Sequence, residues 1–169
     1  MTSHRPALGK CGADVEERFM RTAISLAIDN VRSGRGGPFG SVIVRRGEVL
    51  ATGANCVTST NDPTAHAEIV AIREACRVLG TFQLEECELY TSCEPCPMCM
   101  GAIYWARPVR VYYACTAADA AAIGFDDAFI YEEFRLAPHS RRLPMKQLLR
   151  EESLTAFQAW EQKQDRIRY

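Results

Sequence analysis

Apolar residues in the first third of the chain recur at helical and then at strand spacing. Between residues 14 and 32 they fall three or four positions apart, which predicts an amphipathic helix. Asp14 and Glu17 have the spacing of a capping box, so we expect the helix to begin there and to end at Ser33-Gly34. The glycine-rich segment 36–40 should lead into a strand at 41–44, and a turn at Arg46-Gly47 into a second strand at 48–52. These glycines fit neither the dinucleotide nor the P-loop pattern, so a phosphate cradle is excluded.

The middle of the chain alternates between helix and strand. Asp62 as cap and Pro63 at the first position predict a helix that runs to Leu79, with Gly80 just beyond. We expect strands at 88–91 and 109–114, and between them a helix from Pro95 to about residue 105. After Gly124 the pattern is irregular apart from one helical stretch at 154–160. The alternation favours a single layered α/β domain over residues 14–169, preceded by a mobile extension at 1–13.

Composition and charge fit a globular enzyme better than a nucleic-acid or membrane protein. The 169 residues are 47% hydrophobic and 24% charged, with a net charge of −1, so the whole molecule has no electrostatic footprint for a polyanion. Residues 135–169 hold eight Lys or Arg against four Asp or Glu. We interpret this basic tail as a solvated or subunit-contacting segment in preference to a nucleic-acid site, which we expect to be absent.

Eight cysteines in a chain without an export signal are more typical of metal binding than of disulfides. No apolar run approaches the roughly 18 residues of a membrane span, and residues 1–13 contain no apolar signal core. We therefore expect a cytoplasmic protein that does not enter a membrane. In such a reducing compartment, clustered cysteines are usually metal ligands.

Cys96, Cys99 and His66 have the spacing of a zinc site. The two cysteines lie three positions apart, so on a helix both thiols face one ion. His66, near the start of another helix, supplies a third ligand. Three protein ligands leave one position of a tetrahedral zinc open for water, which distinguishes a catalytic from a structural site. We expect one Zn²⁺ per subunit.

Glu68 is the candidate proton shuttle, two residues after His66 in the same helical turn. The combination H-x-E with P-C-x-x-C is typical of zinc deaminases. A competing interpretation uses Cys93 as well, since a closed Cys3His set would make a non-enzymatic, zinc-stabilised module.

The segments Thr64–Glu68 and Thr91–Ala102 resemble the cytidine deaminase-like superfamily, and within it the bacterial guanine deaminases. The resemblance covers nearly the whole chain after the first dozen residues. It implies a three-layer α/β/α sandwich around a mixed sheet of about five strands. It also implies hydrolysis of guanine to xanthine and ammonia, in purine catabolism or salvage.

The resemblance assigns further roles around the base. Asn55 would hold the purine, and Asp127 would act beside its amino group, although Asp126 is a neighbouring alternative. Phe39 and Trp105 would pack on the ring. The other interpretations are that Phe39 and Trp105 lie in the core and that Asn55 makes a turn. Ala67 and Tyr169 complete the expected substrate contacts.

The C-terminal segment 146–169 would form a lid ending in Tyr169. In the guanine deaminase group such a tail can cross to a partner, so the resemblance implies a homodimer with swapped tails. A frayed tail is the alternative. Guanosine, cytosine and tRNA adenosine are the competing substrates, because their deaminases share the metal pattern.

Overall fold

The computed structural model describes the backbone of residues 10–168 and the side chains of residues 14–168. The chain divides into two compact units, 1–127 and 128–169, which are described separately. The elements of the first unit follow here in chain order: α1 (Lys10–Arg32), β1 (Gly40–Arg45), β2 (Glu48–Ala54), α2 (Val57–Thr60), α3 (Ala67–Leu79), β3 (Cys87–Cys93), α4 (Pro97–Ala106), β4 (Arg110–Cys115) and α5 (Ala117–Ala122).

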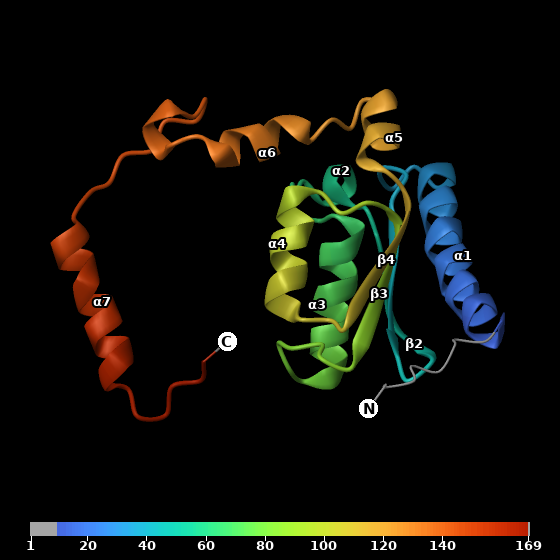
Figure 1. Cartoon of the computed structure of the whole chain (residues 1–169), viewed down its shortest axis with the longest axis horizontal. Helices are drawn as coiled ribbons and strands as arrows, with labels where there is room; N and C mark the ends of the chain where they lie inside the picture. Colours follow the sequence, from blue (N-terminus) through green and yellow to red (C-terminus); the bar gives the residue numbers. More distant parts are fainter. Residues whose placement is uncertain (1–9, 169) are drawn as a thin grey trace, which may run out of the picture. The chain divides into compact units, whose positions relative to one another are not determined.

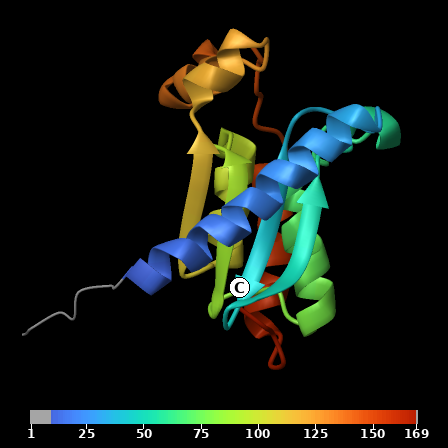
Figure 2. The same cartoon turned by 90° about the vertical axis from the view of Figure 1, so that its right-hand side faces the viewer.

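The first unit is a mixed sheet between two layers of helices. The strand order is β2-β1-β3-β4, with β1 antiparallel to β2 and β3, and β3 parallel to β4. Helix α1 covers one face of the sheet, and α3 and α4 cover the other (Figures 1 and 2). The predicted three-layer sandwich is confirmed, with four strands in the described chain where about five were expected. The residues after β4 form a helix instead, because Thr116 and Asp119 make a capping box before an alanine-rich run.

The hairpin β1–β2 turns where the sequence predicted it. Arg46 and Gly47 both have positive φ, 52° and 79°, the combination that a tight turn between twisted antiparallel strands requires. Side chains of β1 then alternate between the two cores. Val42 and Val44 pack with Phe19 on the α1 side, whereas Ile43 packs with the α3 side.

Glycines let both helical layers approach the sheet closely. A Cβ added at Gly53 on β2 would lie 2.1 Å from the carbonyl oxygen of Ala67 on α3, and one at Gly40 would lie 2.3 Å from the carbonyl oxygen of Ala23 on α1. The first turn of α3 is therefore seated directly on the backbone of β2, which fixes where its side chains point.

Three predicted helix starts are wrong. Helix α1 begins at Lys10, so Asp14 lies inside the helix and not at its cap, and the expected extension is shortened. Helix α3 begins at Ala67 because Asp62 closes a local turn instead, with its Oδ1 accepting from the backbone N (2.8 Å) and the hydroxyl (2.7 Å) of Thr64. Helix α4 begins at Pro97, not at Pro95.

The second unit consists of α6 (Ala128–Arg135), a 3₁₀ turn at Pro138–Ser140 and α7 (Arg150–Gln162). Helix α7 confirms the stretch predicted at 154–160, whereas α5 and α6 were missed. None of residues 128–168 is buried. In the described part of the chain, no helix has the length and apolar character needed to cross a membrane.

Candidate metal centre and its cavity

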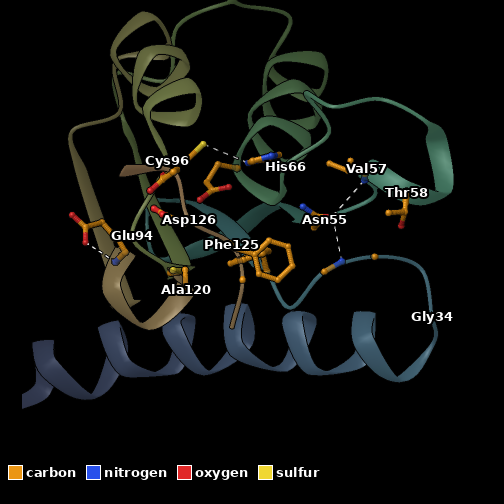
Figure 3. A pocket seen from close by; sticks show the side chains of 18 residues that line it. Gly34, Asn55, Val57, Thr58, His66, Glu94, Cys96, Ala120, Phe125 and Asp126 are labelled. Carbon is orange, nitrogen blue, oxygen red and sulfur yellow. Dashed lines mark hydrogen bonds between the residues drawn. The ribbon is translucent and has the colours of Figure 1, made fainter. Parts of the chain in front are cut away.

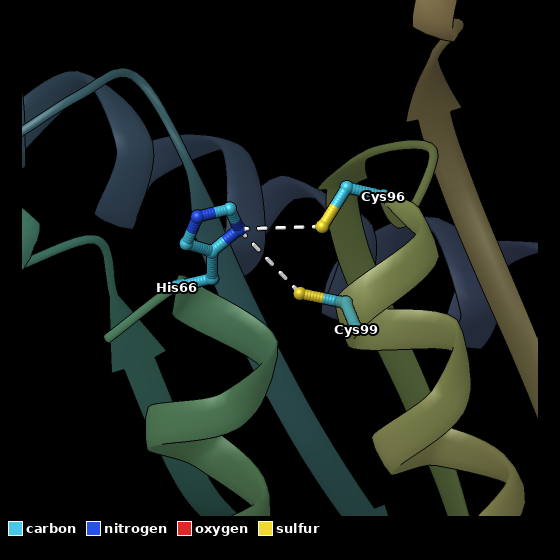
Figure 4. A group of neighbouring side chains, drawn as sticks. All are labelled: His66, Cys96 and Cys99. Carbon is cyan, nitrogen blue, oxygen red and sulfur yellow. Dashed lines mark hydrogen bonds between the residues drawn. The ribbon is translucent and has the colours of Figure 1, made fainter. Parts of the chain in front are cut away.

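The N-termini of α3 and α4 meet, and each is capped by a predicted metal ligand. His66 is the N-cap residue of α3, Cys96 is that of α4, and Cys99 lies in the first turn of α4. Nδ1 of His66 lies 3.5 Å from Sγ of Cys96 and 3.6 Å from Sγ of Cys99 (Figure 4). A tetrahedral zinc bound at ordinary Zn–N and Zn–S lengths separates those atoms by about 3.6 Å. The three side chains therefore fit one zinc ion.

Thiolate formation is favoured at this point of the fold. The hydrogen bond from the Cys99 thiol, together with the one from His66, lowers the pKa of Cys96 to about 4. The same bond, together with burial, raises the pKa of Cys99, and the bond to Cys96 raises that of His66. Both helix N-termini add positive electrostatic potential. The surroundings of Cys96 therefore favour its thiolate form.

Cys93 does not belong to this group. Its Sγ donates to the carbonyl oxygen of Thr116 at 3.6 Å, and burial raises its pKa to about 11. The ligand cluster in the described chain contains only His66, Cys96 and Cys99. The closed Cys3His arrangement is therefore contradicted, and three protein ligands would leave a bound zinc ion able to take one further ligand.

Glu68 lies beside the metal ligands in the second position of α3. The side chain is 6% exposed, and burial raises its pKa. Its Oε1 accepts from the hydroxyl of Thr91 at 3.1 Å, and its Oε2 lies 3.5 Å from Sγ of Cys99. Sequence reasoning missed Thr91, which lies 23 residues away on β3 and comes within reach of Glu68 only in the folded chain.

A cavity of about 530 Å³ opens over this cluster (Figure 3). It is lined by Gly34, Gly36, Gly37, Phe39, Asn55, Val57, Thr58, His66, Glu68, Cys93, Glu94, Cys96, Ala117, Ala120, Gly124, Phe125, Asp126 and Asp127. Four of these carry carboxylates and none is Lys or Arg. Asp127 and Asp126 both line the cavity, and burial raises the pKa of Asp127. Such a lining suits a neutral, amino-bearing ligand and disfavours a phosphate.

Asn55 lines the cavity at the end of β2 and is 6% exposed. Its Oδ1 accepts from the backbone N–H groups of Gly37 (3.3 Å) and Val57 (3.4 Å). Because both partners are donors, they fix the orientation of the amide and leave Nδ2 available to a ligand. The bond to Val57 also makes the turn that was the alternative interpretation, while contact between Asn55 and a purine stays a prediction.

Two phenylalanines form the apolar wall. Phe39 and Phe125 meet edge to face, with ring centroids 4.9 Å apart and an interplanar angle of 87°. Both line the cavity, and the sequence assigned a ring contact to Phe39 but none to Phe125. Its position follows from α5 and from Gly124 at a φ of 93°, which a local pattern does not reveal.

Two predicted contacts, Ala67 and Trp105, do not line the cavity of the described chain. Ala67 is fully buried. Trp105 is 62% exposed on α4 and is neither in the core nor in the cavity wall of the described chain. Tyr169 lies outside the described residues. Glu94 has a supporting role, since its Oε2 accepts from the backbone N of Ala117 at 3.0 Å and so joins the metal loop to α5.

Comparison with known proteins places this geometry among deaminases. Residues 13–115 match the family described as the cytidine and deoxycytidylate deaminase zinc-binding region. The chain is 57% identical to guanine deaminase of Bacillus subtilis over 144 residues, which cover 85% of this chain and 92% of that protein. It is 42% identical to a tRNA-specific adenosine deaminase of Aquifex aeolicus over 99 residues, 59% of this chain and 65% of the relative.

Two solved structures of guanine deaminases are also similar to this chain. The crystal structure of guanine deaminase from Bacillus subtilis matches with a TM-score of 0.89 and 54% identity, covering 90% of this chain and 98% of that one. A guanine deaminase structure from Nitrosomonas europaea matches with a TM-score of 0.63 and 31% identity, covering 74% and 77%.

Proposed function

The chain belongs to the cytidine and deoxycytidylate deaminase family, defined by its zinc-binding region, and we propose that it hydrolyses guanine to xanthine and ammonia. The observation that carries the choice of guanine is the extent of the likeness. Similarity to the Bacillus guanine deaminase spans 92% of that protein, whereas the match to the Aquifex tRNA enzyme stops at 65% of its length. The acidic cavity supports the same choice, because a tRNA substrate brings phosphates that four carboxylates would repel.

His66, Cys96 and Cys99 are the residues that would hold the zinc ion. A zinc ion held there would lower the pKa of a bound water and so supply the nucleophile near neutral pH. Glu68 is the group placed to move protons, because its carboxylate lies against the ligand cluster and lines the cavity. It takes a proton from the attacking water and delivers it to the departing amino group.

Asn55, Phe39 and Asp127 hold the base in this proposal. The Nδ2 group of Asn55 donates to an acceptor on the purine edge, and the Phe39 ring packs on its face. Asp127, from the loop on the other side of the cavity, accepts from the amino group. Phe125 contacts the Phe39 ring and would support it against the purine.

Guanosine is the second candidate substrate, because the cavity is larger than a bare base requires. Its volume of about 530 Å³ falls within the roughly 300–1,000 Å³ of pockets that bind drug-sized ligands. The end lined by Gly34, Val57 and Thr58 carries no charge and is compatible with a ribose. A lid over this end would decide between base and nucleoside.

We further propose a homodimer in which residues 146–169 cross to the partner and Tyr169 closes its site. Helix α4 contains no charged residue, yet Tyr104 and Trp105 are 75% and 62% exposed. Strand β4 is an edge of the sheet, and Tyr113 on it is 51% exposed. None of residues 128–168 is fully buried, so this segment has no hydrophobic core of its own. Apolar surfaces of this kind are typical of subunit interfaces.

The cytoplasmic location of the protein stays a prediction.

Ammonia release from zinc-loaded protein tests the substrate, with guanine, guanosine, adenine, cytosine and a tRNA anticodon stem compared in parallel. We expect guanine to be preferred and Glu68→Gln to lose about 10²–10⁴-fold in kcat while keeping its zinc. Glu74→Gln is the matched control, since Glu74 lies on the same helix and pairs with Arg77 at the surface. Turnover of another substrate with none of guanine would reject the proposal.

Coexpression of two full-length variants tests the crossed tail. If Tyr169 acts in the partner's site, a mixed dimer of Glu68→Gln and Tyr169→Ala chains contains one site with both defects and one with neither. Activity should then exceed that of either variant alone. If the tail stays on its own chain, every site keeps one defect and no activity returns. Sedimentation analysis measures the dimer itself.

A further inference from the structure

Asn30 is a buried polar residue that the proposed chemistry leaves without a role. It lies two residues before the end of α1 and is 1% exposed. Its Nδ2 donates to the carbonyl oxygen of Gly37 at 2.9 Å and to that of Asn55 at 2.7 Å. Both hydrogens of the amide group are thereby used.

These two acceptors belong to the segments that form one wall of the cavity. Gly37 lies in the glycine-rich loop after α1, and Asn55 follows β2. The segments are also bonded to each other, because the backbone N of Gly37 donates to Oδ1 of Asn55 at 3.3 Å. Asn30, Gly37 and Asn55 therefore form a closed cycle of hydrogen bonds, and the side chain of Asn55 is one of its links.

Two glycines bring the loop backbone close to Asn55 and to the aromatic wall. A Cβ at Gly36 would lie 2.1 Å from the carbonyl oxygen of Asn55, so a glycine is required where the two backbones meet. At Gly37 a Cβ would lie 3.3 Å from the Phe39 ring and 3.4 Å from the Phe125 ring. The backbone N of Asn55 donates to the carbonyl oxygen of Phe39 at 3.0 Å, and the side chain of Asn30 on α1 adds the bonds that hold Gly37 and Asn55 from outside the loop.

We propose that Asn30 is a positioning residue for the substrate amide of Asn55. This inference rests on the proposed function, in which Asn55 holds the purine. Asn30 anchors the two backbone segments, at Gly37 and at Asn55, that form this wall of the cavity. The N–H of Gly37, held in place in this way, keeps Oδ1 of Asn55 pointing toward the loop backbone. The Nδ2 group of Asn55 consequently meets the substrate already oriented, without a loss of side-chain entropy on binding.

Removing the amide of Asn30 takes its donor from the buried carbonyl group of Asn55 and leaves the partly buried carbonyl of Gly37 with the backbone N of Phe39 alone (2.8 Å), so the loop relaxes and the orientation of Asn55 loosens. We expect Asn30→Ala to raise KM for guanine about tenfold, the factor that corresponds to one hydrogen bond. kcat should change much less, because the metal cluster and Glu68 lie on α3 and α4. Asn30→Ser keeps one donor and should show a smaller increase, which also provides a variant if the alanine protein does not fold.

A double-mutant cycle distinguishes positioning from a general structural role. In zinc-loaded protein, Asn30→Ala should lower kcat/KM about tenfold when Asn55 is intact, and little in the Asn55→Ala background. Equal losses in the two backgrounds would overturn the proposal. Ser33→Ala is the matched control: it removes the bond from Ser33 to the backbone of Asn30 (3.0 Å) but leaves the Asn30 amide in place, and it should behave as wild type.

A second readout does not depend on turnover. In zinc-loaded protein, hydrogen exchange at the backbone N–H of Gly37 should accelerate at least tenfold in Asn30→Ala and remain unchanged in Ser33→Ala. If the unmodified protein releases no ammonia from guanine, the proposed function fails, and the exchange rates still decide the role of Asn30. An unchanged exchange rate at the N–H of Gly37 in the Asn30 variants would reject the positioning role of Asn30.

Discussion

Gly53→Ala tests whether the packing of α3 on β2 sets the geometry of the site. The added Cβ would lie 2.1 Å from the carbonyl oxygen of Ala67 and 2.6 Å from the backbone N of Ala71, both in α3. Ordinary contact begins near 3.4 Å, so the helix must move away from the strand by about 1.3 Å. His66 and Glu68 lie at that end of α3 and move with it.

Two effects follow from this displacement, and they can be measured separately. Overpacking of this kind costs about 1–3 kcal/mol of unfolding free energy. A misplacement of about 1 Å at a reacting centre costs about 100-fold in rate. We therefore expect kcat to fall about 100-fold at a temperature where the variant is folded, with a weaker affinity for zinc. Thermal unfolding, metal analysis and ammonia release give the three quantities.

Gly101→Ala is the matched control, since a Cβ at Gly101 on α4 meets nothing within 4 Å in the described chain. The same substitution in the middle of a helix should raise the unfolding free energy by about 0.5–1 kcal/mol and leave the rate unchanged. If Gly53→Ala retains wild-type kcat once folded, the seating of α3 does not determine the chemistry and the reasoning is refuted.

Three further predictions concern the partner of Glu68, the metal ligands and the turn that precedes α3. Thr91→Val removes the hydroxyl that Glu68 accepts from, and a bond to a charged group is worth about 1.5–3 kcal/mol, so kcat should fall about 10- to 100-fold while Thr91→Ser stays near wild type. Cys93→Ala should keep one zinc per chain and Cys96→Ala should lose it; equal losses by metal analysis would restore Cys93 as a ligand. Hydrogen bonds from Thr64 lower the pKa of Asp62 in the folded protein. The Asp62 carboxylate therefore stabilises the fold at pH values above the usual carboxyl pKa, and this stabilisation is lost as the pH falls through the lowered pKa of the folded state. The difference in Tm between wild type and Asp62→Asn should shrink on acidification, and a constant difference would contradict this assignment.

The sequence predicts best what depends on short spacing. Cys96 and Cys99 share a helix face at any helix start near Pro95, so the cluster survives the error in where α4 begins. Strands β1, β3 and β4 follow from apolar runs and from the Arg46-Gly47 turn. The contacts of Thr91 and Phe125 could not be predicted in this way, because each depends on the packing of elements more than 20 residues apart.

Trp105 shows the opposite limit. An aromatic residue in an apolar helix predicts burial, yet this side chain is 62% exposed in the single chain. Hydrophobicity indicates that a surface becomes covered but not by which molecule. The same holds for residues 128–168, whose apolar side chains find no core of their own. For both segments, the proposed homodimer would supply the surface that covers these side chains.

The two wrong helix starts at Asp62 and Pro95 have a common physical reason. Local signals favour a helix that begins earlier in each case, with a capping aspartate or a proline at its first position. In the structure, His66 and Cys96 occupy the N-cap positions, and neither makes a side-chain capping bond. A conventional cap is worth about 1 kcal/mol, so each helix gives up that stabilisation where its ligand faces the metal. Local rules of helix formation are broken at the two residues that the proposed chemistry requires, and a bound zinc ion would restore the lost stability because it ties both helix ends together.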